Sequence, residues 1–363
     1  MNLEQIRGKI EEPDQESMEA AKRRWTSVAK PLYSLGKLEN AVIQMAGIKR
    51  TSAYTLDKKG LIIMCADNGI VEEGVTQTGQ EVTAAVADNF TKDEASVCMM
   101  SKSAGVDVFP VDIGMASDVT SVTKKEQKVA YGTKNFAKGP AMTEKEVWRA
   151  IGVGIEMVSK LQKEGYDILA VGEMGIGNTT TSSAVASVLL DVSVEEVTGK
   201  GAGLSDRGLQ KKIAVIKEAV SRMQPDPKDV IDVLSKVGGL DIAGMAGVFL
   251  GGALSHVPIV MDGFISSVAA LCAVRLEPKA KAYILPSHVS KEPAGARMLE
   301  ALGVSPILTC DMCLGEGSGA VAAIPIYEMG LLVYRRMGTF EEMDIEKYQD
   351  YTETLETQKG ISK

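Results

Sequence analysis

Five short apolar runs, each ending in small or polar residues, constrain the fold more than any other feature of the sequence. They are LIIMCADNG from Leu61, VDVFPVDIG from Val106, DILAVGEMG from Asp167, VPIVMDG from Val257 and KAYILPSH from Lys279. Short apolar runs without alternation are typical of strands buried on both faces, as in a parallel sheet. Because helical patterns separate the runs, we predict an α/β fold in which helices flank a parallel sheet, in a Rossmann-like three-layer arrangement.

The clearest helical pattern lies between the third and fourth runs, in residues 205–223. Either Ser205 or Asp206 can cap its start. Its apolar side chains recur at the spacing of one helix face: Leu209, Ile213, Ile216, Val220 and Met223.

The two ends of the chain are more polar than the middle and have helical patterns. We therefore predict a large α/β catalytic domain over residues 31–325 and a small helical domain formed by residues 1–30 together with 326–363. A chain of 363 residues, 45% of them hydrophobic, can bury a core of that size.

Net charge excludes several classes of partner. The formal charge of −8 gives no basic field for a polyanion, so we expect small-molecule substrates and no nucleic acid. No apolar run reaches the roughly 20 residues that span a bilayer, and the first residues lack the order of a signal peptide. We expect no membrane association and a cytoplasmic location.

The cysteines predict neither a disulfide framework nor a metal site. Five scattered cysteines favour reduced thiols. Cys310 and Cys313 form a single CxxC, and with only His256 and His288 beside them four zinc ligands are hard to assemble. We interpret both cysteines as packing residues and expect no metal.

Two glycine-rich turns follow strands and enter helices, as phosphate-binding turns do. GEMGIGNTTTSS spans residues 172–183, and TGKGAGLSD spans residues 198–206 with Lys211 and Lys212 beyond it. Glycine lets backbone N–H groups approach a phosphate, and a helix start favours an anion. Such turns are also common in any α/β fold, so on pattern alone the two interpretations are equally supported.

Two carboxylates can carry glycosidic chemistry. Glu316 stands between glycines in LGEGSGA, and Glu173 follows a buried strand in GEMG. Paired carboxylates suit a transition state that resembles an oxocarbenium ion. For Glu316 the pattern alone favours the alternative of an exposed turn, just as it favours a structural role for His288.

Taken together and in this order, these motifs resemble the nicotinate-nucleotide:dimethylbenzimidazole phosphoribosyltransferase family of cobamide biosynthesis. The resemblance runs from about residue 30 to residue 340. Its most specific parts are AD-x-G-x-x-x-EGV at 66–75, GEMGIGNTT at 172–180, GKGAGLSD at 199–206, MDGFISSVAAL at 261–271, SH-x-S-x-EP at 287–293 and LGEGSGA at 314–320.

The resemblance implies a reaction and a set of roles. Nicotinate mononucleotide gives its 5-phosphoribosyl group to a lower-ligand base, with Glu316 as the base catalyst and Glu173 orienting the acceptor or stabilising charge on the ribose. It implies no cofactor, and a two-fold dimer. Candidates for binding the phosphoribosyl group are Gly175, Gly177, Asn178, Thr179, Thr180, Gly201, Gly203, Lys212 and Ser290. Candidates for binding the acceptor are Asn68, Thr78, Gln80, Met174 and Leu314.

The chain departs from the family pattern mainly around the acceptor. Asn68 stands where the family usually has His, Thr78 and Gly79 replace a Tyr-Pro-like pair, and Ala294 and Gly295 replace Gly-His. Acceptor identity therefore stays open between benzimidazole-type bases, purines and the phenol or p-cresol used by relatives that work as two-paralogue complexes. A homodimer, a heterodimer with a paralogue, and a non-catalytic structural subunit remain alternatives. Because Glu316 and Glu173 are retained, we favour a catalytic subunit.

Overall fold

The computed structural model describes residues 3–349, and the chain folds as two compact units. Among the described residues, the larger unit comprises 3–12 and 56–325, and the smaller comprises 13–55 and 326–349. The first segment belongs to the larger unit because Lys279 Nζ donates to the carbonyl of Ile10 and the Tyr283 hydroxyl to that of Glu11. The sequence analysis assigned residues 1–12 to the small domain and residues 31–55 to the large domain, the reverse of this division, and those bounds stay a prediction. The last part of the predicted small domain, residues 350–363, lies outside the described residues.

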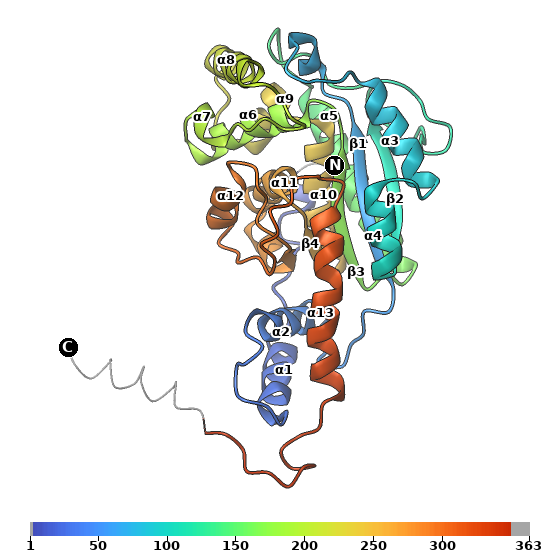
Figure 1. Ribbon diagram of the computed structural model, residues 1–363, viewed down its shortest axis with the longest axis vertical. Helices are drawn as coiled ribbons and strands as arrows, with labels where there is room; N and C mark the ends of the chain where they lie inside the picture. The colour runs from blue at the N-terminus through green and yellow to red at the C-terminus, as the bar shows by residue number, and fades with distance from the viewer. Residues whose placement is uncertain (1–2, 350–363) are drawn as a thin grey trace, which may run out of the picture. The chain divides into compact units, whose positions relative to one another are not determined.

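A five-stranded sheet forms the centre of the larger unit, and all of its pairings are parallel (Figure 1). The strand order is β2-β1-β3-β4-β5. The strands are β1 (Lys59–Ala66), β2 (Val106–Gly114), β3 (Ile168–Met174), β4 (Ile259–Met261) and β5 (Ile284–Pro286). The prediction of an α/β fold with a parallel sheet flanked by helices is confirmed.

Helices of the larger unit lie before, between and after the strands along the chain. They are α3 (Glu81–Thr91), α4 (Ser96–Ala104), α5 (Glu144–Lys163), α6 (Asn178–Leu190), α7 (Val194–Val197), α8 (Asp206–Met223), α9 (Val230–Val237), α10 (Leu240–Ser255), α11 (Phe264–Leu276) and α12 (Gly295–Leu302), with 3₁₀ turns η1 (Leu3–Gln5), η2 (Gly69–Glu73) and η3 (Pro278–Tyr283). Helix α13 (Ser318–Arg336) contains the boundary between the units, at Pro325. Helix α8 matches the predicted pattern, and the hydroxyl of its N-cap Ser205 accepts from the N–H of Gly208.

Helix α10 packs along the sheet and against α5, and glycines set how closely the two helices approach. A Cβ at Gly247 would lie 2.1 Å from the carbonyl oxygen of Ile151, and one at Gly154 would lie 2.1 Å from that of Gly244. Side chains larger than hydrogen would force the helices apart. Among residues 3–349, no helix combines the length and the apolarity that crossing a bilayer requires.

The smaller unit is helical, with α1 (Gln15–Ser27), α2 (Lys37–Lys49) and the part of α13 after Pro325. Trp25 and Tyr334 pack with ring centroids 5.3 Å apart. Lys30 and Glu39 form a buried ion pair at 2.5 Å. Aromatic packing and a paired buried charge therefore hold this unit together.

The carboxyl ends of the parallel strands lie at one edge of the sheet and lead into polar or glycine-rich segments. Strand β1 leads into Asp67 and Asn68, β4 into Asp262, and β5 into Ser287 and His288. The glycine-rich residues 175–177 follow β3. Because ligands of open α/β sheets bind at this edge, a functional site is expected there.

Candidate active site

A cavity of about 330 Å³ opens at the carboxyl edge of the sheet. It is lined by the ends of β3 and β4, the start of α6 and α11, and the loops that precede α12 and α13. Its lining residues are Thr78, Val82, Glu173, Met174, Gly175, Ile176, Asn178, Thr179, Gly201, Ala202, Asp262, Gly263, Phe264, Ile265, Ser266, His288, Ser290, Glu292, Cys313, Leu314, Gly315 and Glu316.

Glu316 lies in an unusual turn just before α13. Gly315, Glu316 and Gly317 all have positive φ, at 85°, 61° and 84°. This conformation is uncommon for a non-glycine residue and is strained. Strain of this kind at a residue that lines a cavity suggests a functional constraint on the position of its side chain.

The side chain of Asp262 holds the Glu316 turn in place by accepting hydrogen bonds from backbone N–H groups of the turn and of α13. Its Oδ2 accepts from the N–H of Gly317 at 3.1 Å, and its Oδ1 accepts from those of Gly319 at 2.7 Å and Ala320 at 3.1 Å. A carboxylate that accepts several N–H groups at a helix start is stabilised by them and by the helix dipole. His288 Nδ1 lies 3.9 Å from Asp262 Oδ1 and 3.0 Å from the Ser287 hydroxyl.

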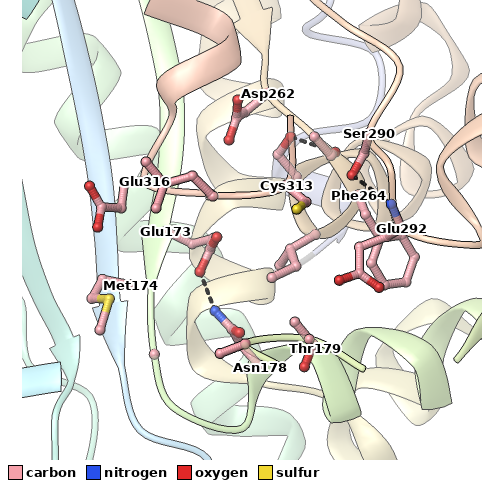
Figure 2. A pocket seen from close by; sticks show the side chains of 18 of the residues that line it. Glu173, Met174, Asn178, Thr179, Asp262, Phe264, Ser290, Glu292, Cys313 and Glu316 are labelled. Atoms are coloured by element: carbon pink, nitrogen blue, oxygen red, sulfur yellow. Dashed lines mark hydrogen bonds between the residues drawn. The ribbon is translucent and has the colours of Figure 1, made fainter. Parts of the chain in front are cut away.

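The carboxyl group of Glu316 is half-buried, and its Oε2 has no hydrogen-bond partner within residues 3–349. Burial raises its pKa above the ordinary value, while the backbone N–H of Val97 acts in the opposite direction. Figure 2 shows the carboxyl group turned away from Glu173. A carboxylate with a raised pKa and a free oxygen is suited to accept a proton.

Glu173 lies at the end of β3, in the middle of the cavity, and is 6% exposed. Its Oε2 accepts a hydrogen bond from Asn178 Nδ2 (Figure 2). Burial, followed by the charges of Asp241 and Asp262, raises the pKa of Glu173 well above its ordinary value. The group can therefore hold a proton at a pH where an exposed glutamate is charged.

The first glycine-rich loop follows β3 and begins α6. A Cβ at Gly175 would lie 2.0 Å from the carbonyl oxygen of Ala66, so the loop can pack on the end of β1 only with glycine there. Gly177 has φ +94° and caps α6, which starts at Asn178. The loop thus presents a helix start to the cavity, where Asn178 and Thr179 line it.

The second glycine-rich turn covers a buried lysine. Lys212 of α8 is 1% exposed, and its Nζ donates to Thr179 Oγ1 at 2.9 Å and to the carbonyl of Gly199 at 3.1 Å. Burial lowers its pKa to about 8, with the charge of Glu292 acting in the opposite direction. Gly201 and Gly203 turn at φ +54° and +100°. A cation directly behind Thr179 makes this end of the cavity favourable for an anion.

Comparison with known proteins identifies the family. A family described as phosphoribosyltransferase matches residues 10–345. A nicotinate-nucleotide–dimethylbenzimidazole phosphoribosyltransferase of Acetivibrio thermocellus is 51% identical over 92% of this chain and 95% of its own length. The enzyme of the same name from Ruminiclostridium cellulolyticum is 46% identical over 96% and 99%. This chain belongs to that family. CobT from Thermus thermophilus has a similar crystal structure, with a TM-score of 0.86 and 34% identity over 92% of this chain and 100% of that one.

The cavity of this phosphoribosyltransferase brings together most, though not all, of the site residues predicted from the sequence. Those that line it are Thr78, Glu173, Met174, Gly175, Asn178, Thr179, Gly201, Ser290, Leu314 and Glu316. Those outside its lining are Asn68, Gln80, Gly177, Thr180, Gly203 and Lys212. Asn68 is 1% exposed, and its Oδ1 accepts from Thr181 Oγ1 behind the first glycine-rich loop. The roles assigned to these residues stay predictions.

Sequence reasoning assigned no site role to several residues that line the phosphoribosyltransferase cavity. Those with an acidic, aromatic or imidazole side chain are Asp262, Phe264, Glu292 and His288. The first two were part of the MDGFISSVAAL motif but were given no role, although an Asp directly after a buried strand is a signal for a site residue. His288 was interpreted as structural, and it does contact Ser287 and Asp262 while also lining the cavity.

The prediction that Cys310 and Cys313 are packing residues is wrong. Both are exposed free thiols in the irregular loop before the Glu316 turn, and Cys313 lines the cavity of the phosphoribosyltransferase. A loop without regular structure lies at the surface and buries little, which explains the difference. Throughout the described part of the chain, His, Cys, Asp and Glu side chains form no group of three that could hold a metal ion.

Proposed function

We propose that this chain moves the 5-phosphoribosyl group of nicotinate mononucleotide onto an aromatic lower-ligand acceptor, releasing nicotinate and forming an α-ribotide for cobamide biosynthesis. One observation carries the proposal: Glu316, in its strained turn, lines one end of a cavity whose other end has the features of a phosphate site. Figure 2 shows Met174 and Glu316 on one side and Thr179, Ser290 and Glu292 on the other. We call these the Glu316 end and the Ser290 end.

The Ser290 end binds the donor in this proposal. The start of α6, the hydroxyls of Thr179 and Ser290 and the positive charge of Lys212 suit a phosphate. The 5-phosphate then anchors the ribose with its anomeric carbon towards Glu173. Binding energy from the phosphate, which takes no part in the bond changes, positions the reacting atoms.

The Glu316 end binds the acceptor in this proposal. Met174 lies on this side of the cavity (Figure 2) and offers an apolar surface that an aromatic ring can contact, as do Val82 and Leu314 elsewhere in the lining. Glu316 takes the proton of the attacking nitrogen or hydroxyl. The raised pKa of Glu316 brings its basicity closer to neutral pH. The ring of the donor is a pyridinium bonded to the anomeric carbon, so nicotinate is a good leaving group and takes the electron pair of the broken bond. The acceptor attacks from the opposite side, so the anomeric configuration inverts.

Glu173 lies between the two ends (Figure 2). In this proposal it orients the acceptor or stabilises positive charge that develops on the ribose in the transition state. Its fixed hydrogen bond from Asn178 keeps the carboxyl group in place. The chain's own residues thus supply binding, orientation and a base without any cofactor.

The remaining parts of the proposal concern assembly and location. By family resemblance we propose a dimer, either of two copies or with a paralogue, a Rossmann-like three-layer arrangement of the large domain, and a small helical domain built from both chain ends. The scattered cysteines, all free within the described residues, support a cytoplasmic location.

An acceptor panel tests the proposal. Purified protein is given nicotinate mononucleotide with dimethylbenzimidazole, adenine, phenol or p-cresol, and nicotinate release and ribotide formation are followed by chromatography. We expect turnover with at least one acceptor. The departures at Asn68 and Thr78 keep the phenols in the panel. Absence of turnover with every acceptor, alone and with a paralogue, would contradict catalysis and favour a structural subunit.

A further inference from the structure

Asp241, in the first turn of α10, is a buried carboxyl group that the proposed reaction does not use. It is completely buried and lies outside the cavity lining. Its Oδ1 accepts from the N–H of Ile242 at 2.9 Å, whereas its Oδ2 has no hydrogen-bond partner in residues 3–349. Burying a carboxyl oxygen without a partner costs free energy, so its presence calls for a functional explanation.

Asp241 lies directly beneath the first glycine-rich loop. A Cβ at Gly175 would come within 3.3 Å of Asp241 Oδ2. A Cβ at Gly239 would lie 2.4 Å from Asp241 Oδ1 and 2.8 Å from Asn68 Oδ1, so Asp241 and Asn68 meet behind the loop. The loop that lines the cavity therefore rests on a polar layer with an acidic group in it.

Asn178 connects this layer to the cavity. Its Nδ2 donates to Glu173 Oε2 (Figure 2). The same side-chain amide acts on Asp241, where it opposes the rise of the carboxyl pKa that burial causes. The backbone N–H of Asn178 donates to the carbonyl of Gly175 at 3.2 Å, in the part of the loop that lies against Asp241. Asn178 therefore joins the loop above Asp241 to the carboxyl group in the cavity.

We propose that Asp241 is a positioning residue of the phosphoribosyl transfer, which acts on Glu173 through the first glycine-rich loop and Asn178 without touching the substrates. This inference rests on the proposed function. Asp241 supports the loop at Gly175, whose carbonyl accepts from the N–H of Asn178 at 3.2 Å, and the Asn178 side chain in turn holds the carboxyl group of Glu173 between the two ends of the cavity. Reacting groups held in this way lose little orientation when the substrates bind.

Asp241 also sets the charge that Glu173 experiences. The titratable groups facing Glu173 are Asp241 from α10, Asp262 after β4, Glu316 before α13 and Cys65 of β1, and the Asn178 amide faces it from α6. After burial, Asp241 is the largest contributor to the raised pKa of Glu173. Burial raises the pKa of Asp241 itself to about 7. Near neutral pH the two carboxyl groups therefore compete for protons, and negative charge on one favours a proton on the other.

Asp241→Asn tests this, because it keeps the size of the side chain and removes the charge. We measure kcat and KM for nicotinate release from about pH 5 to 9, with thermal melting as the check on folding. We expect kcat to fall about tenfold and KM for nicotinate mononucleotide to change less than about twofold, since the acting residue contacts no substrate. The limb of the pH profile set by Glu173 shifts to lower pH by about one unit, because removing a negative neighbour lowers the Glu173 pKa.

Two further variants make the test specific. In a Glu173→Gln background, Asp241→Asn causes no further shift, since the group on which it acts is gone. Asp112→Asn is the matched control: Asp112 is also completely buried, on β2, and pairs with Lys128 at 3.0 Å, away from Glu173. We expect it to lower the melting temperature and leave the pH profile unshifted.

The outcomes separate this inference from the proposed function. No nicotinate release by the wild-type protein contradicts the function itself. The inference is overturned if the wild type is active and Asp241→Asn leaves the pH profile unshifted. It is also overturned if Asp241→Asn causes the same shift in the Glu173→Gln background. Should Asp241→Asn not fold, Asn178→Ala tests the same link, and a kcat equal to that of the wild type overturns it.

Discussion

The Glu316 end and the Ser290 end of the cavity hold their charged groups in opposite ways. Glu316 lies in a turn of three left-handed residues, and one of its carboxyl oxygens has no hydrogen-bond partner within the described chain. Behind the Ser290 end, Lys212 is buried, and its ammonium group donates to Thr179 and to the carbonyl of Gly199. The carboxyl group of Glu316 therefore lies in a strained turn and lacks a partner for one buried oxygen, whereas the ammonium group of Lys212 has two hydrogen-bond partners.

The difference indicates how the two ends divide the work. A group that must exchange a proton during each turnover needs a free oxygen, while a group that holds a phosphate needs a fixed position. Changes at the Glu316 end should therefore affect mainly kcat, and changes at the Ser290 end mainly KM for the donor. Substitutions at the two ends, and at Glu173 between them, test whether kcat and KM respond separately.

Glu316→Gln removes the base and keeps its shape. We expect kcat to fall by about 10²–10⁴-fold, the usual contribution of a general base. The wild-type kcat should rise with pH through a pKa above the ordinary glutamate value, because only the deprotonated carboxylate accepts a proton, and the variant should lack this limb. Stopped assays of nicotinate release measure both effects. The exposed Glu300→Gln on α12 is the control, and a kcat for Glu316→Gln within about fivefold of its value would falsify the assignment.

Lys212→Met removes the buried charge at the Ser290 end. We expect KM for nicotinate mononucleotide to rise about 10–100-fold, since a hydrogen bond to a charged group contributes about 1.5–3 kcal/mol. In the free wild-type enzyme KM should also rise above a pH of about 8, where Lys212 loses its proton, and the variant should lack this rise. Initial rates at varied donor concentration measure this. Exposed Lys211→Met should leave KM unchanged, and a loss confined to kcat would contradict the division of work.

Gly317→Ala tests the strained turn through stability. Its Cβ would lie 2.4 Å from Leu61 Cδ1 in a residue with φ +84°, so we expect the free energy of unfolding to fall by about 1–3 kcal/mol. Denaturant unfolding measures it. Gly139→Ala is the control, because a Cβ there meets nothing within 4 Å. Equal stability of the two variants would show that the turn tolerates side chains and is not strained.

Glu173→Gln, between the two ends, should increase stability at alkaline pH. The folded-state pKa of Glu173 is raised, so its contribution to stability is fully present below the unfolded pKa of about 4.3 and is lost as pH rises through the folded pKa. Removing the charge should therefore stabilise the protein more at about pH 8 than at about pH 5, by about 1 kcal/mol per pKa unit. Melting curves at both values measure this. Buried Glu277→Gln, outside the cavity, is the control, and a pH-independent difference for Glu173→Gln would contradict the buried charge.

Much of the fold and of the cavity could be predicted from the sequence. The apolar runs predicted all five strands, and the motifs placed Glu316, Glu173, Thr179 and Ser290 at one site because the carboxyl ends of parallel strands converge. The sequence shows glycines on either side of Glu316. It does not reveal that the glutamate itself takes a left-handed conformation, since non-glycine residues rarely do.

What could not be predicted depends on contacts between distant segments. Asp262 supports the Glu316 turn although it lies 55 positions before Gly317, and no local pattern announces hydrogen bonds over that distance. Asn68 was placed at the acceptor by the family resemblance, yet its Oδ1 accepts from Thr181 Oγ1 behind the loop. In each case the direction of the side chain decides the role, and tertiary packing sets that direction.

Gly172, on β3, is in direct contact with the backbone of the turn that carries Glu316. A Cβ on it would lie 2.5 Å from the carbonyl carbon and oxygen of Glu316. The main chain that carries the proposed base therefore rests on the sheet with no side chain between them, whereas Thr78 and Val82 reach the cavity from the neighbouring segment around α3. If the proposed roles hold, substitutions in that segment change the preferred acceptor while the base keeps its place. Acceptor preference and proton transfer then belong to parts of the chain that can change independently.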